Sequence, residues 1–487
     1  MSDKIPVVDV TEKKHTSHAA QPKLNVHDPE AYFNFLKKTK ETINNISPSF
    51  CAAKWMQSTI LLYNGETHSC HHPSRHHIRL DDIKDNPSGI HNTAHKMKAR
   101  QEMLNGIQTK ECDYCWRVEN QNSEHISDRV YKSSYSWSLP YIDDIIDSGV
   151  GKNIIPSYVE VAFDSTCNFK CIYCSPESSS RWQEEITKNG PIPQTQHPLH
   201  NLDWLKKVGK LPIHHKEHNP YIEAFWKWWP ELYPNLQTFR ITGGEPLLSK
   251  HTWRLFDYVQ EHPNKDMVLA VNSNLNVPDN KVDQMIDAIN RMSPNLKNFD
   301  VYTSLENTGI QAEYSREGMN YEEFLENCYK VLDNTPDSTR LHIMTTINLT
   351  SAPSFLSFLK QIKRFRVKYQ PSLHDYRVRV HFSYLRHPAA LILSLLSEED
   401  KKRYGDIWLD YVNNWKITER KLPDEFFYHE EVNQVERLVE FMRNDKQPKQ
   451  TYDNMRMYLD AIDTRRDKNF KKTFPELTYL MDTNYYG

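Results

Sequence analysis

The chain is short of glycine, of apolar residues and of net charge, and these shortages limit the kinds of protein that it can be. Only 13 of its 487 residues are glycine, so long flexible linkers between domains are not expected. Hydrophobic residues make up 38% of the chain, below the usual globular share, but aromatic residues at 11% still allow a core to be buried. The net charge is −3, so the bulk charge does not indicate a nucleic-acid partner.

Long apolar runs are also missing. The longest run, around residues 389–396, is far shorter than the roughly 20 residues of a membrane-spanning helix. The first four residues lack the apolar core of a signal peptide. We therefore expect a cytoplasmic protein without a membrane partner, in which clustered cysteines bind metal rather than form disulfides.

Cysteine is present, and most of it is clustered. The eight cysteines are Cys51, Cys70, Cys112, Cys115, Cys167, Cys171, Cys174 and Cys328. Cys328 lies alone in a helical pattern and is predicted to be a core residue.

Three cysteines fall within eight positions, at Cys167, Cys171 and Cys174. They follow residues 158–163, a β-branched and aromatic run that predicts a strand. Three thiolates on one short loop can bind three irons of a cubane cluster and leave the fourth iron open to a substrate or a second cofactor. A zinc knuckle is the alternative, although it needs a further cysteine or histidine ligand.

The four N-terminal cysteines flank a predicted hairpin and a predicted helix. Strands are expected at 58–63 and 66–70, because Asn64-Gly65 is a strong turn signal. Cys51 precedes this hairpin and Cys70 ends it. A helix is expected at 93–106, and Cys112 and Cys115 follow it. Four such thiolates could hold either zinc or a fully ligated iron–sulfur cluster.

Strand-like runs alternate with helical patterns from residue 157 onward. The strands are expected at 158–163, 236–242, 267–272, 298–304, 341–347 and 377–384, and the helices at 249–261, 279–292, 320–334 and 353–367. This alternation predicts an α/β fold with parallel strands, whose ligands gather at the carboxyl ends of the strands. Polar residues follow five of the strands: Cys167, then Gly243-Gly244-Glu245-Pro246, then Asn272 with Ser273, then Ser304 with Glu306, then Thr346 with Asn348.

Two further segments complete the predicted domain organisation. The insertion at 175–235 is rich in tryptophan, and its Phe225–Trp229 run is predicted to be mainly a packed helix face. Helical spacing of apolar residues predicts a helical C-terminal extension. We therefore expect a disordered or loosely attached tail at 1–26, a small α+β cluster-binding domain with its connector at 27–156, a barrel at 157–394 and the extension at 395–487.

The C-x3-C-x-Tyr-C loop at 167–174, together with the GGEP loop at 243–246, resembles the radical S-adenosylmethionine (SAM) superfamily over about residues 157–390. The resemblance implies a partial (β/α)6 TIM-like barrel. It implies a [4Fe-4S] cluster on Cys167, Cys171 and Cys174, with SAM on the fourth iron. It also implies reductive cleavage of SAM to a 5′-deoxyadenosyl radical, which abstracts hydrogen from a substrate, and an electron donor such as a flavodoxin or ferredoxin.

The same resemblance implies roles for residues that contact SAM. Tyr173 would lie against the adenine, and the loop of Gly243, Gly244, Glu245 and Pro246 would receive the methionyl amine, with Glu245 as an acceptor. Ser304 and Arg316 resemble the ribose and carboxylate contacts of the family. Asn272 and Ser273 are further candidates for SAM binding.

The N-terminal cysteines, with Gly65 between Cys51 and Cys70, resemble the auxiliary-cluster modules called SPASM and, in shortened form, twitch. Such modules normally follow the barrel, whereas this one precedes it, as in N-terminal-twitch radical SAM proteins. The resemblance implies a second [4Fe-4S] cluster on Cys51, Cys70, Cys112 and Cys115, and a peptide or protein substrate. Two alternatives stay open: a sugar, nucleotide or other small-molecule substrate, or a non-enzymatic interaction module stabilised by zinc or a cluster.

Overall fold

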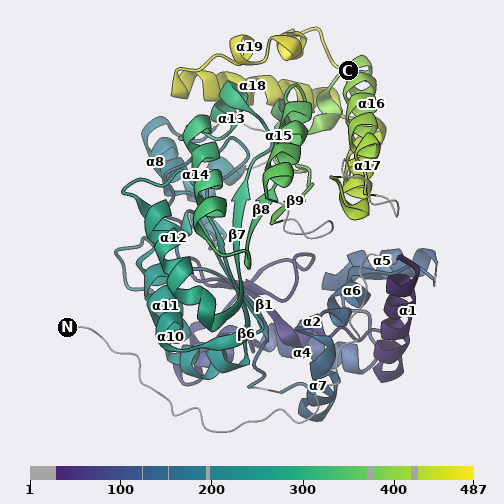
Figure 1. Ribbon diagram of the computed structural model, residues 1–487, viewed down its shortest axis with the longest axis vertical. Helices are drawn as coiled ribbons and strands as arrows, with labels where there is room; N and C mark the ends of the chain where they lie inside the picture. Colours follow the sequence, from purple (N-terminus) through teal and green to yellow (C-terminus); the bar gives the residue numbers. More distant parts are fainter. Residues whose placement is uncertain (1–28, 123, 152, 193–197, 370–376, 418–425) are drawn as a thin grey trace. The chain divides into compact units, whose positions relative to one another are not determined.

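The computed structural model describes residues 29–122, 124–151, 153–192, 198–369, 377–417 and 426–487 (Figure 1). The tail predicted at 1–26 lies outside the described residues. Of the helices in the described part, none is long and apolar enough to cross a membrane.

The fold is α/β and is built on one mixed, largely parallel sheet. Among the described residues, nine strands are hydrogen-bonded in the order β3-β2-β1-β4-β5-β6-β7-β8-β9. Their bounds are β1 Gln57–Leu61, β2 Glu66–His68, β3 His76–His77, β4 Tyr158–Ala162, β5 Thr238–Thr242, β6 Asn264–Asn272, β7 Leu296–Ser304, β8 Thr339–Met344 and β9 Val378–His381. The hairpin and the six later strands are therefore confirmed.

The N-terminal hairpin joins this sheet, which the sequence did not predict. Strand β1 pairs antiparallel with β2 and parallel with β4, with Gln57 opposite Tyr158 and Leu61 opposite Ala162. The turn between β1 and β2 closes through the N–H of Gly65, which donates to the C=O of Leu61 at 2.8 Å. Gly65 has a φ of +70°, a left-handed conformation that glycine adopts without strain.

The chain divides into two compact units. One unit contains residues up to Asp164 together with 213–241 and 264–269. Its helices are α1 Pro29–Ile46, α2 Ala53–Met56, α3 Leu80–Lys84, α4 Ala94–Leu104, α5 Asp113–Gln121, α6 Asp128–Ser134, α7 Ile142–Ser148 and α10 Pro220–Leu232. Helix α4 begins after Thr93, whose side chain accepts the N–H of Lys96, as expected of a capping residue.

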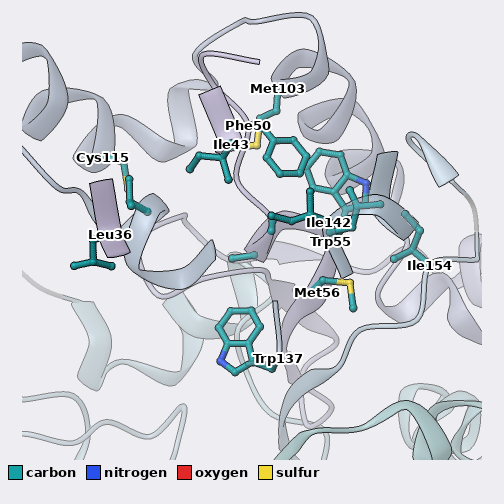
Figure 2. Close-up of a cluster of buried hydrophobic side chains, with 14 of the residues drawn as sticks. Leu36, Ile43, Phe50, Trp55, Met56, Met103, Cys115, Trp137, Ile142 and Ile154 are labelled. Carbon is teal, nitrogen blue, oxygen red and sulfur yellow. The ribbon is translucent and has the colours of Figure 1, made fainter. Parts of the chain in front are cut away.

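The core of this unit is aromatic. Figure 2 shows Phe50 beside Trp55, with ring centroids 5.1 Å apart, and the indole N–H of Trp55 donates to the C=O of Gly149 at 2.7 Å. Cys51 and Cys112 pack against this core, and Cys115 is part of it. In the same unit, Trp226, Trp228 and Trp229 of α10 are all buried, which confirms the packed helix face.

The second unit contains residues 165–212, 242–263 and 270–487. Its helices are α8 Ser180–Asn189, α9 Leu202–Lys207, α11 Lys250–Glu261, α12 Lys281–Met292, α13 Gly309–Ser315, α14 Tyr321–Asn334, α15 Phe355–Lys368, α16 Glu398–Asn414, α17 His429–Asn444, α18 Lys449–Arg466 and α19 Phe470–Thr473. The four predicted barrel helices are confirmed as α11, α12, α14 and α15, and Cys328 is buried in α14.

One face of strands β7, β8 and β9 is apolar and covered. Strands β7, β8 and β9 pair in parallel, and their buried positions include Val301, Leu341, Ile343 and Val380. Helix α14 packs against β8 and α15 against β9 (Figure 1). Because side chains alternate along a strand, the residues between these positions point to the opposite face of the sheet.

Candidate active site

The three-cysteine loop follows β4 in the chain and is fixed by backbone hydrogen bonds. The N–H of Ile172 donates to the C=O of Ser315 at 2.8 Å, which holds the loop beside the end of α13. The N–H of Cys174 donates to the C=O of Cys171 at 3.0 Å and closes a tight turn. All three cysteine residues of the loop are half-buried.

Aromatic side chains secure the carbonyl groups of this loop. The indole N–H of Trp182 donates to the C=O of Cys171 at 2.9 Å. Nε2 of His200 donates to the C=O of Cys174 at 2.9 Å. Burial lowers the pKa of His200 to about 4, so the ring is neutral at pH 7 and acts as a plain donor.

Burial favours the neutral form of these thiols. Burial raises the pKa of Cys174 to about 12 and also raises the pKa of Cys167 and Cys171. The N–H of Phe169 donates to Sγ of Cys167 at 3.4 Å. A buried thiol becomes a thiolate where positive charge compensates it, and cluster iron supplies that charge.

The GGEP loop packs directly on the backbone that precedes Cys167. The N–H of Glu245 donates to the C=O of Thr166 at 2.7 Å. A Cβ atom on Gly244 would lie 2.3 Å from the carbonyl oxygen of Thr166, so only glycine fits there. Gly243 has a φ of +133°, which glycine also adopts more easily than other residues.

Glu245 is buried and holds two loops together. Its Oε1 accepts the N–H of Leu247 at 3.1 Å, and its Oε2 accepts the N–H of Asn274 at 2.7 Å. Burial raises the pKa of Glu245 to about 7. Asn274 in turn donates from Nδ2 to Oδ1 of Asn168 at 2.8 Å, so this network reaches the three-cysteine loop.

Tyr173 of the three-cysteine loop forms a hydrogen-bonded triad with the buried residues Glu306 and Arg316. The hydroxyl of Tyr173 donates to Oε1 of Glu306 at 2.8 Å, and Nη1 of Arg316 donates to the Tyr173 oxygen at 2.5 Å. Burial raises the pKa of Glu306. Oε2 of Glu306 and Nε of Arg316 are buried and find no hydrogen-bond partner among the described residues. These two atoms are therefore available to hydrogen-bond to a ligand.

A family model described as Radical SAM superfamily matches residues 163–359. These residues form a radical SAM domain. The chain is accordingly an enzyme that performs radical SAM chemistry with a [4Fe-4S] cluster and SAM, so the non-enzymatic alternative is wrong. The comparison with curated proteins found no match, and neither did the comparison with solved structures.

The residues of the radical SAM domain fit these cofactors. Cys167, Cys171 and Cys174 offer three thiols on one loop, and Gly244 lets the GGEP loop pack closely against the backbone beside them. When bound, the cluster and SAM supply the electron and the 5′-deoxyadenosyl radical. The side chains of Tyr173 and Arg316 are fixed by each other before any ligand arrives, which lowers the entropy lost on binding.

The other predicted SAM contacts lie at strand ends. Asn272 is the last residue of β6 and Ser304 the last residue of β7, and both are partly exposed. Ser273 is buried, and its Oγ accepts the N–H of Leu275 at 3.1 Å. Pro246 is buried at the start of a short 3-10 helix, Pro246–Leu248. Contact of these residues with SAM stays a prediction.

The structure also reveals residues near the loop that the sequence did not indicate. The hydroxyl of Tyr458 donates to the C=O of Ile172, and Nη1 of Arg466 donates to the C=O of Lys170 at 2.9 Å. Both donors lie on α18, which is distant from the loop in the sequence, and neither belongs to a recognisable sequence motif. Glu306, which follows β7 by two residues, was expected at a strand end, but its hydrogen bond with Tyr173 was not.

Outside the radical SAM domain, the four N-terminal cysteines line one cavity. Cys51 precedes α2, Cys70 follows β2, Cys112 precedes α5 and Cys115 lies in α5. The cavity holds about 390 Å³ of empty space, including its open mouth. Burial raises the pKa of Cys51 and of Cys115 to about 12.

The sulfurs in this cavity do not form the close set that one zinc ion binds. Zinc binds thiolates at about 2.3 Å, so four thiolates around one zinc lie roughly 4 Å apart. In the part of the chain that the structure describes, the set of three metal-binding groups with atoms within 4.8 Å of one another is His71, His72 and Asp128. No three of the described cysteine sulfurs are that close, so a tetrahedral zinc site is not preformed.

Basic side chains border the same cavity. Lys54, Arg129 and Lys132 all line it. Lys54 is paired with Glu111, and Arg129 is paired with Glu119 at 2.7 Å. The side chains of Lys54 and Arg129 are 3% and 1% exposed, so their charges act with little screening by solvent.

Proposed function

We propose that this radical SAM enzyme modifies a peptide or protein, and that it carries a second [4Fe-4S] cluster bound by Cys51, Cys70, Cys112 and Cys115. The observation that carries the second part is the arrangement of these four thiols, which come from separate chain segments and border one cavity. Thioether or carbon–carbon crosslinking, epimerisation and oxidation are the reaction types that we consider.

One feature supports a cluster over zinc at this site. No three of the described sulfurs lie as close together as the ligands of one zinc ion. Lys54 and Arg129 border the same cavity as ion pairs with Glu111 and Glu119.

The choice of substrate class rests on the resemblance of the four-cysteine segment to twitch modules, which often accompany peptide maturation. A sugar, nucleotide or other small molecule is the second candidate. In the peptide reading, the auxiliary cluster accepts an electron from the substrate radical or anchors the substrate. A flavodoxin or ferredoxin as electron donor, a cytoplasmic location and the lack of nucleic-acid and membrane partners stay predictions.

Metal and sulfide analysis after anaerobic reconstitution tests the second cluster. We expect about eight irons and eight labile sulfides per wild-type chain. Cys112→Ala halves both numbers and still yields 5′-deoxyadenosine, whereas Cys171→Ala halves them and yields none. Cys328→Ala is the matched control, because this cysteine is buried in α14 and belongs to neither site; its iron content equals that of the wild type.

Each result has a defined consequence. Zinc without sulfide at the N-terminal site contradicts the auxiliary cluster but leaves the radical SAM centre standing. Absence of 5′-deoxyadenosine from a fully reconstituted wild-type enzyme contradicts the proposed function as a whole.

The substrate class is tested by incubating the reconstituted enzyme with SAM and candidate peptides encoded near its gene. A mass change in a peptide that depends on both SAM and Cys171 supports the peptide reading. Turnover of a sugar or nucleotide with no change in any peptide favours the second candidate.

A further inference from the structure

Titratable side chains gather on the face of β7, β8 and β9 that lies opposite the apolar one. Pairing places Tyr302 opposite His342, and His342 opposite Arg379. The row nearer the carboxyl ends contains Ser304, Met344 and His381. The row on the other side pairs Asp300 with Arg340. Because alternate residues of a strand share a face, all these side chains lie on the face opposite Val301 and Ile343.

Three of these residues form a diagonal chain across the strands. Nε2 of His342 lies 3.4 Å from Oδ2 of Asp300, and Nδ1 of His342 lies 3.1 Å from Nε2 of His381. The rings of His342 and Tyr302 stack, with centroids 4.3 Å apart. The contacts therefore run from β7 through β8 to the last residue of β9.

Asp300 and His342 are buried, and each has a polar atom without a hydrogen-bond partner. Asp300 is 9% exposed and His342 is 6% exposed. Oδ1 of Asp300 and Nε2 of His342 find no hydrogen-bond partner among the described residues. The 3.4 Å separation is long for a hydrogen bond, and such contacts in catalytic sites often shorten when a ligand binds. His381 is exposed.

The carboxylate of Asp300 determines which nitrogen of each histidine donates and which accepts a hydrogen bond. An ionised carboxylate only accepts hydrogen bonds, so it selects the tautomer of His342 with hydrogen on Nε2. Nδ1 of His342 is then an acceptor and receives the Nε2–H of His381. The lone pair of His381 is consequently on Nδ1, and this nitrogen is the basic end of the chain.

The basic end lies at the edge of the sheet where the predicted SAM contacts are. Ser304, Met344 and His381 occupy one row, so His381 is two strands away from Ser304, about 10 Å. The charged neighbours on this face are Arg340 and Arg379. Behind β9, Arg366 and Glu431 neutralise each other in a buried pair at 2.6 Å.

We propose that Asp300, His342 and His381 form a proton relay, with His381 as the catalytic base and the other two as positioning residues. His381 takes the proton of a substrate N–H, O–H or S–H group at this edge. The bond from hydrogen to the heteroatom breaks, its electron pair stays on the heteroatom, and the proton binds Nδ1 of His381. The imidazolium is stabilised through His342 by the carboxylate of Asp300, and no electron is gained or lost in this step.

The relay deepens the proposed function, since it assigns a substrate group that carries an acidic hydrogen. It rests on the proposed function only in that the substrate binds at this edge. The tautomers of His342 and His381 can be observed in the protein without substrate, so the relay can be tested without turnover.

Long-range ¹H–¹⁵N spectra of the holoenzyme labelled in histidine report which ring nitrogens carry hydrogen. Signals are assigned with His342→Gln and His381→Gln. In the wild type we expect hydrogen on Nε2 of both rings. In Asp300→Asn the amide can donate to His342, so the hydrogen moves to Nδ1 and the polarity of the chain is lost. Asp300→Glu restores the wild-type pattern.

The matched control is Asp333→Asn, which removes an exposed carboxylate on α14 that binds Lys368 and leaves both histidine patterns unchanged. Hydrogen on Nδ1 of His342 in the wild type, or an unchanged tautomer in Asp300→Asn, overturns the relay. If Asp300→Asn does not fold, His381→Gln tests the contact between the two histidines. Loss of the hydrogen bond to Nδ1 of His342 in this variant supports the relay, and an unchanged Nδ1 signal contradicts it. A confirmed relay in an enzyme that never forms 5′-deoxyadenosine would contradict the proposed function alone.

Discussion

The carboxylate of Glu245 accepts the backbone N–H of Asn274 at 2.7 Å, and this bond ties the loop after β5 to the loop after β6. The carboxylate is 1% exposed, and burial raises its pKa to about 7. In an unfolded chain its pKa would be about 4.3. A carboxyl group whose pKa is raised on folding stabilises the protein at low pH and loses that contribution as the pH rises through the folded value.

Glu245→Gln therefore changes the pH dependence of stability. The substituted amide is neutral at every pH, so the free energy of unfolding of the wild type relative to the variant is larger at pH 5 than at pH 8, by about 2 kcal/mol. Urea denaturation of cluster-free protein at the two pH values measures this difference. Glu261→Gln, at the exposed end of α11, is the control and shows no such change. An equal difference at both pH values would contradict the prediction.

Gly244→Ala should disrupt the contact between the GGEP loop and the three-cysteine loop. The new Cβ would lie 2.3 Å from the carbonyl oxygen of Thr166, and backbone atoms cannot move aside as a flexible side chain can. We expect a loss of about 2 kcal/mol of stability and SAM binding weakened about tenfold or more. Denaturation and equilibrium binding of SAM measure the two effects.

Gly190→Ala is the control for that substitution. Gly190 also has a positive φ, +77°, but a Cβ atom added there would meet no other atom within 4 Å. Its ψ is 177°, so its replacement carries backbone strain of about 2 kcal/mol but leaves SAM binding intact. Equal effects of the two substitutions on SAM binding would show that the close approach at Gly244 is unimportant.

Local pattern predicted the elements of this fold well, because strand and helix signals are carried by adjacent residues. The six later strands and the helices α11, α12, α14 and α15 were all expected from such signals. The parallel pairing of β1 with β4 was not, since Gln57 and Tyr158 lie about a hundred residues apart and a five-residue strand carries no signal for its partner.

The site also contains residues that the sequence predicted and residues that it could not predict. Spacing identified the three-cysteine loop and the GGEP loop, because the chemistry fixes the distances between those residues along the chain. Tyr458 contacts Ile172 across 286 positions, and no short motif can record such a contact. The chain from Asp300 to His381 depends on the register of three strands, which alternation alone does not define.

Arg316→Met should destabilise the protein by leaving a buried carboxyl group without its cation. Arg316 is 5% exposed and Glu306 is fully buried, and both bind the hydroxyl of Tyr173. Removing one member of a buried charged set costs about 3 kcal/mol. Urea denaturation at pH 8 measures the loss. Adding Glu306→Gln to Arg316→Met should restore about half of it, and strictly additive losses would contradict coupling through Tyr173.

Lys54→Met should lower the reduction potential of the proposed auxiliary cluster. Lys54 is buried, lines the four-cysteine cavity and pairs with Glu111, and the neighbouring Cys112 acts against burial to raise its pKa. Reduction adds negative charge to the cluster, so loss of a nearby cation makes reduction harder, by on the order of 50 mV. A redox titration followed by EPR, in a Cys171→Ala background that lacks the other cluster, measures the potential.

Two variants separate this charge effect from a packing defect. Lys54→Met combined with Glu111→Gln removes the cation and its partner anion together, so its potential should fall by less than that of Lys54→Met alone. Lys110→Met removes an exposed lysine nearby in the sequence and should leave the potential unchanged, because solvent screens an exposed charge. A fall of the same size in the double variant would mean that Lys54 acts through packing, and its charge would then have no part in setting the potential.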